Sequence, residues 1–173
     1  MDFRADRVGA ALAGTNPTVL RRLPTGFAVI GDVQHLPGYC VLITDTPGAD
    51  QVTDLAPEAQ LAFLADAALL ARAVSTVCAR RDPEFRRINV ELQGNTDAFL
   101  HAHVTPRYEW EPSDIVGWPA ALHHWTGRVA DEHRLGPRHD DLRAELGAAL
   151  DEELALRAGS STPRRAPRRA APR

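Results

Sequence analysis

A single long helical pattern, residues 57–81, lies between two groups of strand-like segments and constrains the fold more than any other feature. Pro57 suits the first position of a helix, and Glu58 suits the positive end of the helix dipole. Apolar or small side chains at helical spacing predict its buried face: Leu61, Leu64, Ala68, Ala71, Ser75 and Cys78. The polar residues expected on the exposed face are Asp66, Arg72 and Arg80.

The segments around this helix predict a sheet. Four runs rich in Val, Ile, Tyr and Phe have the composition of strands: 26–30, 38–44, 88–92 and 99–107. Residues 3–13 predict a short first helix, and a leucine at every fourth position predicts a last helix over 137–157. Strands grouped around one long helix favour an α+β fold over a doubly wound one. We therefore expect an antiparallel sheet of about five strands with one long central helix and a C-terminal helix.

The length of 173 residues fits one domain, which we place at residues 1–157. Residues 158–173 form a tail of small residues, proline and arginine that cannot offset its own ordering entropy, so we expect it to be disordered. All 20 basic residues are arginine, and five of them lie in the last ten positions without an acid. The remaining chain is acidic, which disfavours binding to a nucleic-acid backbone; only the tail offers a weak contact of that kind.

Targeting features are not evident in the sequence. The N-terminus lacks a basic segment followed by an apolar one, and no apolar run approaches the roughly 18 residues of a membrane span. Cys40 and Cys78 suit two buried thiols in a reducing compartment better than one bridge. These features favour a cytoplasmic protein without a membrane partner.

Two histidines two residues apart are the most informative motif. On a strand, His101 and His103 share one face, with Phe99 and Thr105 in line. The opposite face carries small apolar side chains that fit a core: Leu100, Ala102 and Val104. A sheet with one dry face and one histidine-bearing face is a suitable base for a functional site.

Taken alone, the pair is compatible with three interpretations. The histidines can be surface or hydrogen-bonded residues without a further role. They can be metal ligands, but a third ligand such as Glu91 or His35 would have to be brought in by folding. Finally, a neutral imidazole can attack phosphorus while its neighbour binds phosphate oxygens or protonates the leaving group. The adjacent pair His123-His124 is interpreted as a surface feature, and the three tryptophans of the 108–136 stretch as packing residues.

Three motifs in order favour the third interpretation. They are Phe27-Ala28-Val29-Ile30-Gly31-Asp32, then Pro37-Gly38-Tyr39-Cys40-Val41-Leu42-Ile43, then Gly94-Asn95 followed by His101, His103 and Pro106-Arg107-Tyr108. Together they resemble the histidine triad (HIT) family of nucleotide hydrolases and transferases over about residues 25–108. The resemblance is closest to bacterial members described as diadenosine-polyphosphate-hydrolase-like.

The resemblance implies roles for individual residues. His101 corresponds to the nucleophile of the family and His103 to its third histidine, whereas Phe99 stands at the first triad position. The Phe99 carbonyl can still accept the Nδ1 proton of His101 and leave Nε2 free. Tyr39 stands where several relatives have another histidine.

Four further residues are candidates for substrate binding. Asn95 and Thr96 correspond to the phosphate-contacting pair of the family, or else form an ordinary polar turn. Asn89 can face the same pocket or be a plain strand residue, and Asp32 can bind the ribose hydroxyls or belong to a turn.

The function implied is a nucleotide hydrolase or nucleotidyl transferase acting on dinucleoside polyphosphates or nucleotide phosphoramidates through a covalent nucleotidyl-histidine. No metal or other cofactor is required for this chemistry, and family members commonly form homodimers through the long helix and the adjoining strand. The alternative is a non-catalytic nucleotide- or nucleic-acid-binding protein with a degenerate triad.

Overall fold

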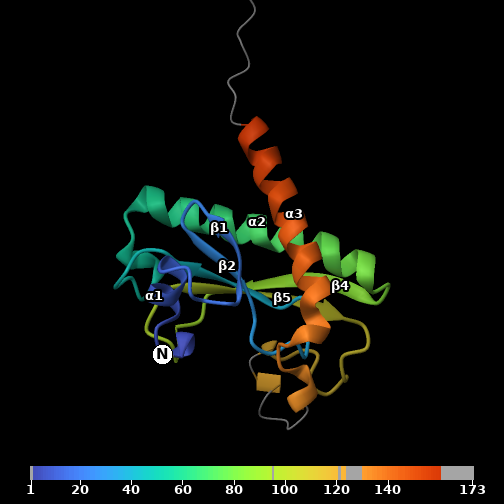
Figure 1. Cartoon of the computed structure of the whole chain (residues 1–173). Helices are drawn as coiled ribbons and strands as arrows, with labels where there is room; N and C mark the ends of the chain where they lie inside the picture. Colours follow the sequence, from blue (N-terminus) through green and yellow to red (C-terminus); the bar gives the residue numbers. More distant parts are fainter. Residues whose placement is uncertain (1, 95, 121, 124–129, 161–173) are drawn as a thin grey trace, which may run out of the picture.

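A five-stranded antiparallel sheet with the order β1-β2-β3-β5-β4 forms the centre of the computed structural model, which describes residues 2–94, 96–120, 122–123 and 130–160 (Figure 1). The strands are β1 (Val19–Leu23), β2 (Gly26–Ile30), β3 (Cys40–Thr44), β4 (Phe85–Glu91) and β5 (His101–Tyr108). The helices are α1 (Arg7–Leu12), α2 (Pro57–Arg81) and α3 (Asp140–Ser160). Short 3-10 turns are η1 (Phe3–Ala5), η2 (Val52–Asp54), η4 (Asp131–His133) and η5 (Pro137–His139). The predicted α+β class and antiparallel sheet are confirmed, and α2 has the predicted bounds.

Several element boundaries differ from the sequence prediction. Strand β3 begins at residue 40 and not at 38, β4 spans 85–91 and not 88–92, and α1 spans 7–12 and not 3–13. Strand β1 was not expected, because Arg21 and Arg22 interrupt its apolar residues; it is an edge strand paired only with β2. Strand β5 begins at His101, two residues later than predicted. Helix α3 continues to Ser160, so residues 158–160 are helical, while the rest of the expected tail lies outside the described residues.

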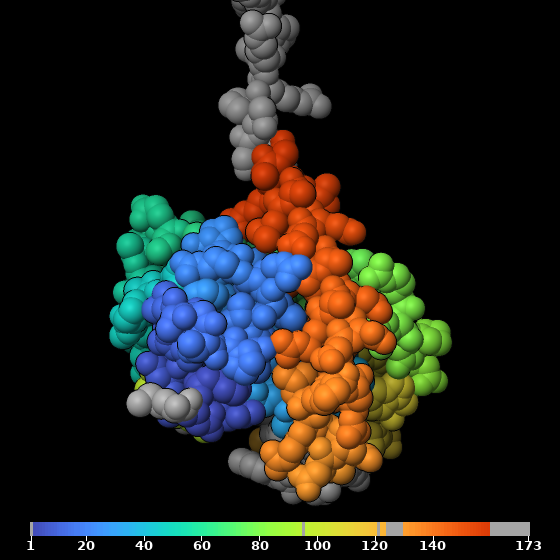
Figure 2. Space-filling model, in the orientation of Figure 1, coloured from blue at the N-terminus to red at the C-terminus, as the bar shows by residue number. Residues whose placement is uncertain are grey.

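One face of the sheet is covered by α2 and α3 (Figure 1). Alternate strand residues point into this layer, and the innermost are fully buried: Ala28, Ile30, Cys40, Leu42, Ala102 and Val104. Both cysteines are free thiols in this core. The last turns of α3 project beyond the body of the protein, and Leu156 is 68% exposed there (Figure 2).

The buried face of α2 is not the predicted one. Leu61 and Leu64 are 70% and 44% exposed, whereas Asp66 is completely buried. The Asp66 carboxylate accepts hydrogen bonds from the backbone N–H and the hydroxyl of Thr25 at 2.8 and 2.7 Å, and pairs with Arg157. These partners stabilise a buried charge, and their positions far away in the chain explain why the helical pattern alone gave the wrong face.

Helix α2 is long and apolar enough to cross a membrane by length and composition alone. Half of its most apolar window is buried within the fold, as expected of a core helix packed on a sheet. Its apolar character is therefore accounted for by the core.

The other face of the sheet carries α1 and the segment after β5. Ala11 of α1 packs on Phe27, Val29 and Ile43 in a second, smaller apolar cluster. The segment after β5 is anchored by the buried Arg107, which donates to the Glu111 carboxylate and to the carbonyls of Val116 and Trp118. The Pro-Arg motif therefore has a structural role, because its arginine holds the chain that follows β5.

Candidate active site

His101 occupies the first position of β5, opposite Ile43 of β3 on the smaller-cluster face. Its Nδ1 lies 2.7 Å from the carbonyl oxygen of Phe99, which can only accept a hydrogen bond. The Nδ1 atom therefore carries the proton, and Nε2 keeps its lone pair. This is the hydrogen bond expected from the sequence, and it is made by the backbone, so the phenylalanine at this position does not remove it.

His103 lies beside His101, with ring centroids 4.8 Å apart and ring planes at 80°. Burial lowers the pKa of His103 from 6.5 to about 4, and the neighbouring His101 acts in the same direction. Asp97 opposes this shift and does not reverse it. His103 is therefore a neutral imidazole at neutral pH.

The proton of His103 is placed by Tyr39. The Tyr39 hydroxyl lies 2.6 Å from His103 Nδ1, and the two rings are nearly parallel. Burial raises the pKa of Tyr39, so the phenol stays protonated and donates its hydrogen to Nδ1. The proton of the neutral His103 ring is then on Nε2. In this structure His101 offers a lone pair at Nε2 and His103 offers an N–H at Nε2.

A short loop fixes Tyr39. The Gln34 side chain donates to the carbonyls of Gly31 and Tyr39, and accepts from the N–H of Gly38. A Cβ atom at Gly31 would lie 2.2 Å from the Tyr39 ring, so only glycine leaves room for it. Gly38 has a φ of 96°, which favours glycine on backbone grounds. The Pro37-Gly38-Tyr39 motif therefore positions the hydroxyl on His103.

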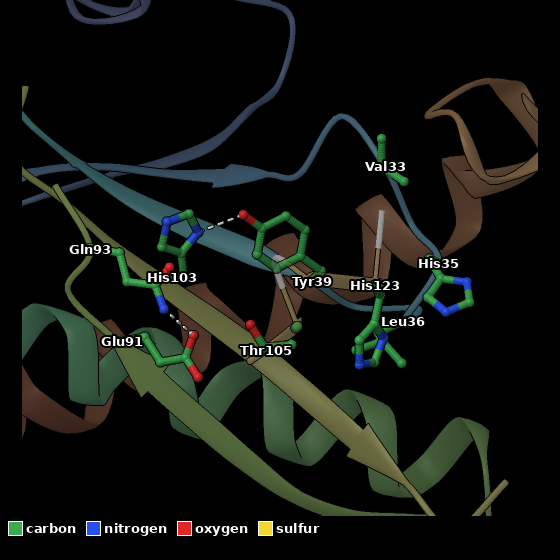
Figure 3. A pocket seen from close by; sticks show the side chains of 10 residues that line it. Val33, His35, Leu36, Tyr39, Glu91, Gln93, His103, Thr105 and His123 are labelled. Carbon is green, nitrogen blue, oxygen red and sulfur yellow. Dashed lines mark hydrogen bonds between the residues drawn. The ribbon is translucent and has the colours of Figure 1, made fainter. Parts of the chain in front are cut away.

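Two cavities share Tyr39 and His103 in their walls. The His101 cavity, of about 210 Å³, has apolar walls from β2 and β3 and polar groups at its rim; its lining includes Arg7, Val29, Gly31, Asp32, Val41, Ile43, Asp97, Phe99, His101 and His103. The Glu91 cavity, of about 160 Å³, lies on the other side of Tyr39 and His103; its lining includes Val33, His35, Leu36, Glu91, Gln93, Thr105, Ala120 and His123 (Figure 3).

The Glu91 cavity contains a polar pair, of which the sequence indicated Glu91 only as a possible metal ligand. Glu91 stands directly opposite His103 in the β4–β5 pairing, and the Gln93 amide donates to its carboxylate at 3.0 Å (Figure 3). The strand register brings Glu91 here, and only a prediction of that register would have found it.

Asp32 lines the His101 cavity as predicted, but it is not unpartnered. Its Oδ2 accepts from Arg7 at 2.6 Å and from Arg4 at 3.0 Å, while its buried Oδ1 has no hydrogen-bond partner within the described part of the chain. Arg7 was not identified from the sequence. It comes from α1, and no local motif links it to the histidines.

The other predicted binding residues are spread out. Asn89 faces the same side of the sheet, opposite Thr105, but it does not line either cavity. Thr96 lines a third cavity against α1, which shares Arg7, Asp97 and Phe99 with the His101 cavity. Asn95 lies outside the described residues.

The metal interpretation finds no support in the described part of the chain, which contains no group of three or more His, Cys, Asp or Glu side chains placed to hold an ion. His123 was expected at the surface and is instead buried, edge-on to His35, with its Nε2 4.0 Å from the Glu111 carboxylate. His124 lies outside the described residues.

Of the described tryptophans, Trp110 has a ring contact that fits the packing interpretation. Trp110 stacks on Tyr108 and donates to Asp82, away from both cavities. Trp118 is 48% exposed, with its carbonyl bound by Arg107. Trp125 lies outside the described residues.

No family model and no curated protein matches the chain. Among solved structures, a histidine triad protein from Bradyrhizobium japonicum is similar with a TM-score of 0.60 and 18% identity, covering 78% of this chain and 88% of that one. The chain has the histidine triad fold. A hypothetical histidine triad nucleotide-binding protein from Sulfolobus tokodaii is similar with a TM-score of 0.59 and 9% identity, covering 84% and 91%. A zinc-bound histidine triad family protein from Mycobacterium smegmatis is similar with a TM-score of 0.56 and 18% identity, covering 86% of this chain and 96% of that one.

Within the histidine triad fold, the geometry of the pair decides what the site can do. One imidazole has a nucleophilic nitrogen, and its neighbour has a donor. A cavity with apolar walls and polar groups at the rim adjoins both. Such a site can hold a ligand with an aromatic part and a phosphoryl group.

Proposed function

We propose that this protein is an enzyme of the histidine triad family that hydrolyses or transfers nucleotidyl groups, with His101 as the nucleophile. The observation that carries this proposal is the hydrogen bond from His101 Nδ1 to the Phe99 carbonyl. It fixes the tautomer in which Nε2 is nucleophilic, and it does so beside a cavity that suits a nucleoside.

In the first step, the lone pair of His101 Nε2 attacks the α-phosphorus of a nucleotide. A P–N bond forms, and the bond from phosphorus to the leaving group breaks, with its electron pair going to the leaving group. The Nδ1 proton stays on the ring, where the Phe99 carbonyl stabilises the positive charge that develops. The product of this step is a nucleotidyl-histidine.

In the second step, the oxygen of water or another acceptor attacks the same phosphorus. The P–N bond breaks, its electron pair returns to Nε2, and the acceptor loses a proton to solvent or to the departed group. Two displacements with a covalent intermediate divide one difficult step into two easier ones.

His103 is assigned as a hydrogen-bond donor. Its lowered pKa keeps it neutral, and Tyr39 holds its proton on Nε2. A neutral imidazole N–H stabilises a phosphoryl oxygen and is a poor proton donor to a leaving group. Of the two roles left open by the sequence, the geometry of the site favours phosphate binding.

The nucleoside is assigned to the His101 cavity. The side chains of Val29, Val41 and Ile43 supply an apolar wall for a base, and Asp32 offers a carboxylate to ribose hydroxyls. Dinucleoside polyphosphates and nucleotide phosphoramidates are the proposed substrate classes. Thr96, Asn95 and Asn89 remain candidates for additional polar contacts, and the cytoplasm is the proposed compartment.

A homodimer is proposed on the exposed apolar side chains of α2 and of β4, the edge strand next to β5. They are Leu61 and Leu64 on α2, Val90 on β4 and Leu92 just beyond it. An exposed edge strand with apolar residues is a surface that pairs readily with a second copy. Light scattering of the purified protein measures this directly.

The test of the proposed function is product formation. Incubation with diadenosine tetraphosphate or adenosine 5′-phosphoramidate is expected to release AMP. His101→Ala is expected to lose about three orders of magnitude in turnover, because no other nucleophile takes its place. His139→Ala is the matched control, since His139 lies outside both cavities.

The covalent intermediate gives an independent measurement. Wild-type protein quenched during turnover is expected to carry one nucleoside monophosphate on His101, in an acid-labile and base-stable linkage. An adduct on His103, or activity that survives in His101→Ala, would overturn the assignment. Nucleotide binding without turnover would instead favour the non-catalytic alternative.

A further inference from the structure

Arg7, the first residue of α1, reaches the His101 cavity from outside the sheet. One of its terminal nitrogens donates to Asp32 Oδ2 at 2.6 Å. The guanidinium has five N–H donors, and among the described residues this is its one hydrogen bond. Arg7 is therefore held in place by a single carboxylate and keeps spare donors at the cavity.

The charges around the cavity are unbalanced without it. Asp32 and Asp97 line the cavity with negative charge, and Arg7 is the one arginine among its described lining residues. His103 is neutral, so it contributes a dipole but no charge. A nucleotide brings further negative charge, which a site of this kind binds only with a compensating cation.

The position of Arg7 also fits the phosphate end of a nucleotide. Arg7 lines the adjoining cavity together with Thr96, the described member of the predicted phosphate-contacting pair. Burial raises the pKa of Tyr39, and the positive charge of Arg7 acts against that shift, so the guanidinium lies within electrostatic reach of the hydroxyl bound to His103.

We propose that Arg7 is the phosphate-binding cation of the His101 cavity and that Asp32 holds it in position. On this view, which rests on the proposed function, Arg7 keeps its contact with Asp32 and turns its spare donors to a phosphoryl oxygen of the substrate. It raises affinity for the anionic part of a nucleotide. Asp32 Oδ1, which is buried and has no hydrogen-bond partner among the described residues, stays available to a ribose hydroxyl.

Arg4 provides a matched comparison. It donates to the same Asp32 oxygen at 3.0 Å, but it is half exposed and does not line the His101 cavity. If the only role of Arg7 were to neutralise Asp32, loss of Arg4 would have a similar effect. If Arg7 binds phosphate, the two variants differ.

The experiment measures binding of two probes, AMP and adenosine, by calorimetry in the full chain. Wild type is expected to bind AMP more tightly than adenosine by roughly tenfold to a hundredfold, the value of a charge-assisted contact. Arg7→Gln should reduce this preference to less than about threefold with adenosine affinity little changed. Arg4→Gln should keep the wild-type preference. Asp32→Asn should weaken adenosine binding and also reduce the AMP preference, because it removes the carboxylate that holds Arg7 in position.

The outcomes separate this inference from the proposed function. If wild type binds neither probe, the proposed function is wrong and the inference falls with it. If wild type prefers AMP and Arg7→Gln retains that preference, Arg7 is not the phosphate-binding residue although the site is real. An equal loss in Arg4→Gln would also overturn the assignment. Should Arg7→Gln unfold, Arg7→Lys tests the same point, since it keeps the charge and loses the planar fork; we expect it to retain part of the AMP preference.

Discussion

Two buried polar sites on opposite faces of the sheet differ in how many of their hydrogen-bonding groups are engaged. On the α2–α3 face, the buried Asp66 has its carboxylate satisfied by two donors of Thr25 and by Arg157. On the other face, no residue that the structure describes forms a hydrogen bond with His101 Nε2 or with the buried Asp32 Oδ1. The first arrangement fixes a structure, and the second leaves bonding capacity for a ligand.

The difference shows that burial of a polar group does not by itself indicate a site. Asp66 is as deeply buried as any residue in the protein, yet its partners leave it nothing to offer a ligand. His101 is nearly as buried and has one ring nitrogen engaged and the other unengaged by any described residue. A buried polar group indicates a binding site when some of its donors or acceptors are not engaged by the neighbouring residues.

The largest effect on stability is expected from removing the Asp66 carboxylate on the α2–α3 face. Asp66→Ala leaves the Thr25 donors unpaired in the core and separates α3 from its charged partner. We expect a loss of about 3 kcal/mol in the free energy of unfolding, measured by urea denaturation, because a buried group has lost its partners. Turnover per folded molecule should be unchanged.

Asp151→Ala is the control for that measurement. It removes an ion pair with Arg21 that also joins α3 to the sheet, but this pair is exposed. Exposed pairs contribute little, so the stability should hardly change. Equal losses of unfolding free energy for the two variants would show that the buried hydrogen bonds of Asp66 contribute no more than an exposed ion pair.

A second prediction concerns the hydrogen bond between Tyr39 and His103 on the other face of the sheet. Tyr39→Phe keeps the ring and removes the donor that holds the His103 proton on Nε2. We expect turnover to fall by about tenfold to a hundredfold, the range of a single oriented donor, with little change in stability. Nitrogen chemical shifts of the His103 ring should show a mixture of tautomers. A ring that stays in one tautomer would show that Tyr39 is not what fixes it.

The smallest effect concerns pH. Burial, with His101 in second place, lowers the pKa of His103 from 6.5 to about 4, so the folded protein disfavours its protonation. The unfolded chain takes up this proton near its ordinary pKa, so the stability from this group is present above pH 6.5 and is lost as the pH falls toward 4. Because His103 is only partly buried, we expect a loss of about 1 to 2 kcal/mol over that interval.

The measurement is a difference between two proteins. Urea denaturation is measured for wild type and for His103→Gln between pH 6.5 and about 4. The difference between the two unfolding free energies removes the contribution of the other histidines. The stability of wild type should fall more steeply on acidification. Parallel curves would mean that the pKa of His103 is not lowered by folding.

Local patterns predicted much of the fold. The 57–81 helix has its predicted bounds because Pro57 sets its start and Pro83 follows its end. The alternation around His101 and His103 predicted their shared face, since a strand has a period of two. Strand β1 was not predicted, because pairing with β2 and contact with α3 stabilise a segment whose own residues give a weak signal.

The candidate site was predicted only in part. The two histidines and Asp32 come together at one cavity, but Asn89 does not line it. Arg7 was not identified, and Glu91 was considered only as a metal ligand, because each reaches the site through packing or strand register. The partners of Asp66 were missed for the same reason: Thr25 lies 41 residues from it in the chain, and Arg157 lies 91.

The sequence by itself determined that two imidazoles share one face of a strand, because backbone geometry between neighbouring residues is local. It also indicated that the carbonyl of Phe99, two residues before His101, is available to the His101 ring. The tertiary structure alone decided which proton His103 carries, which cation lies beside the cavity and which side of the long helix is buried. Each of these depends on a hydrogen bond or ion pair between distant segments, and such pairs form only once the chain has packed.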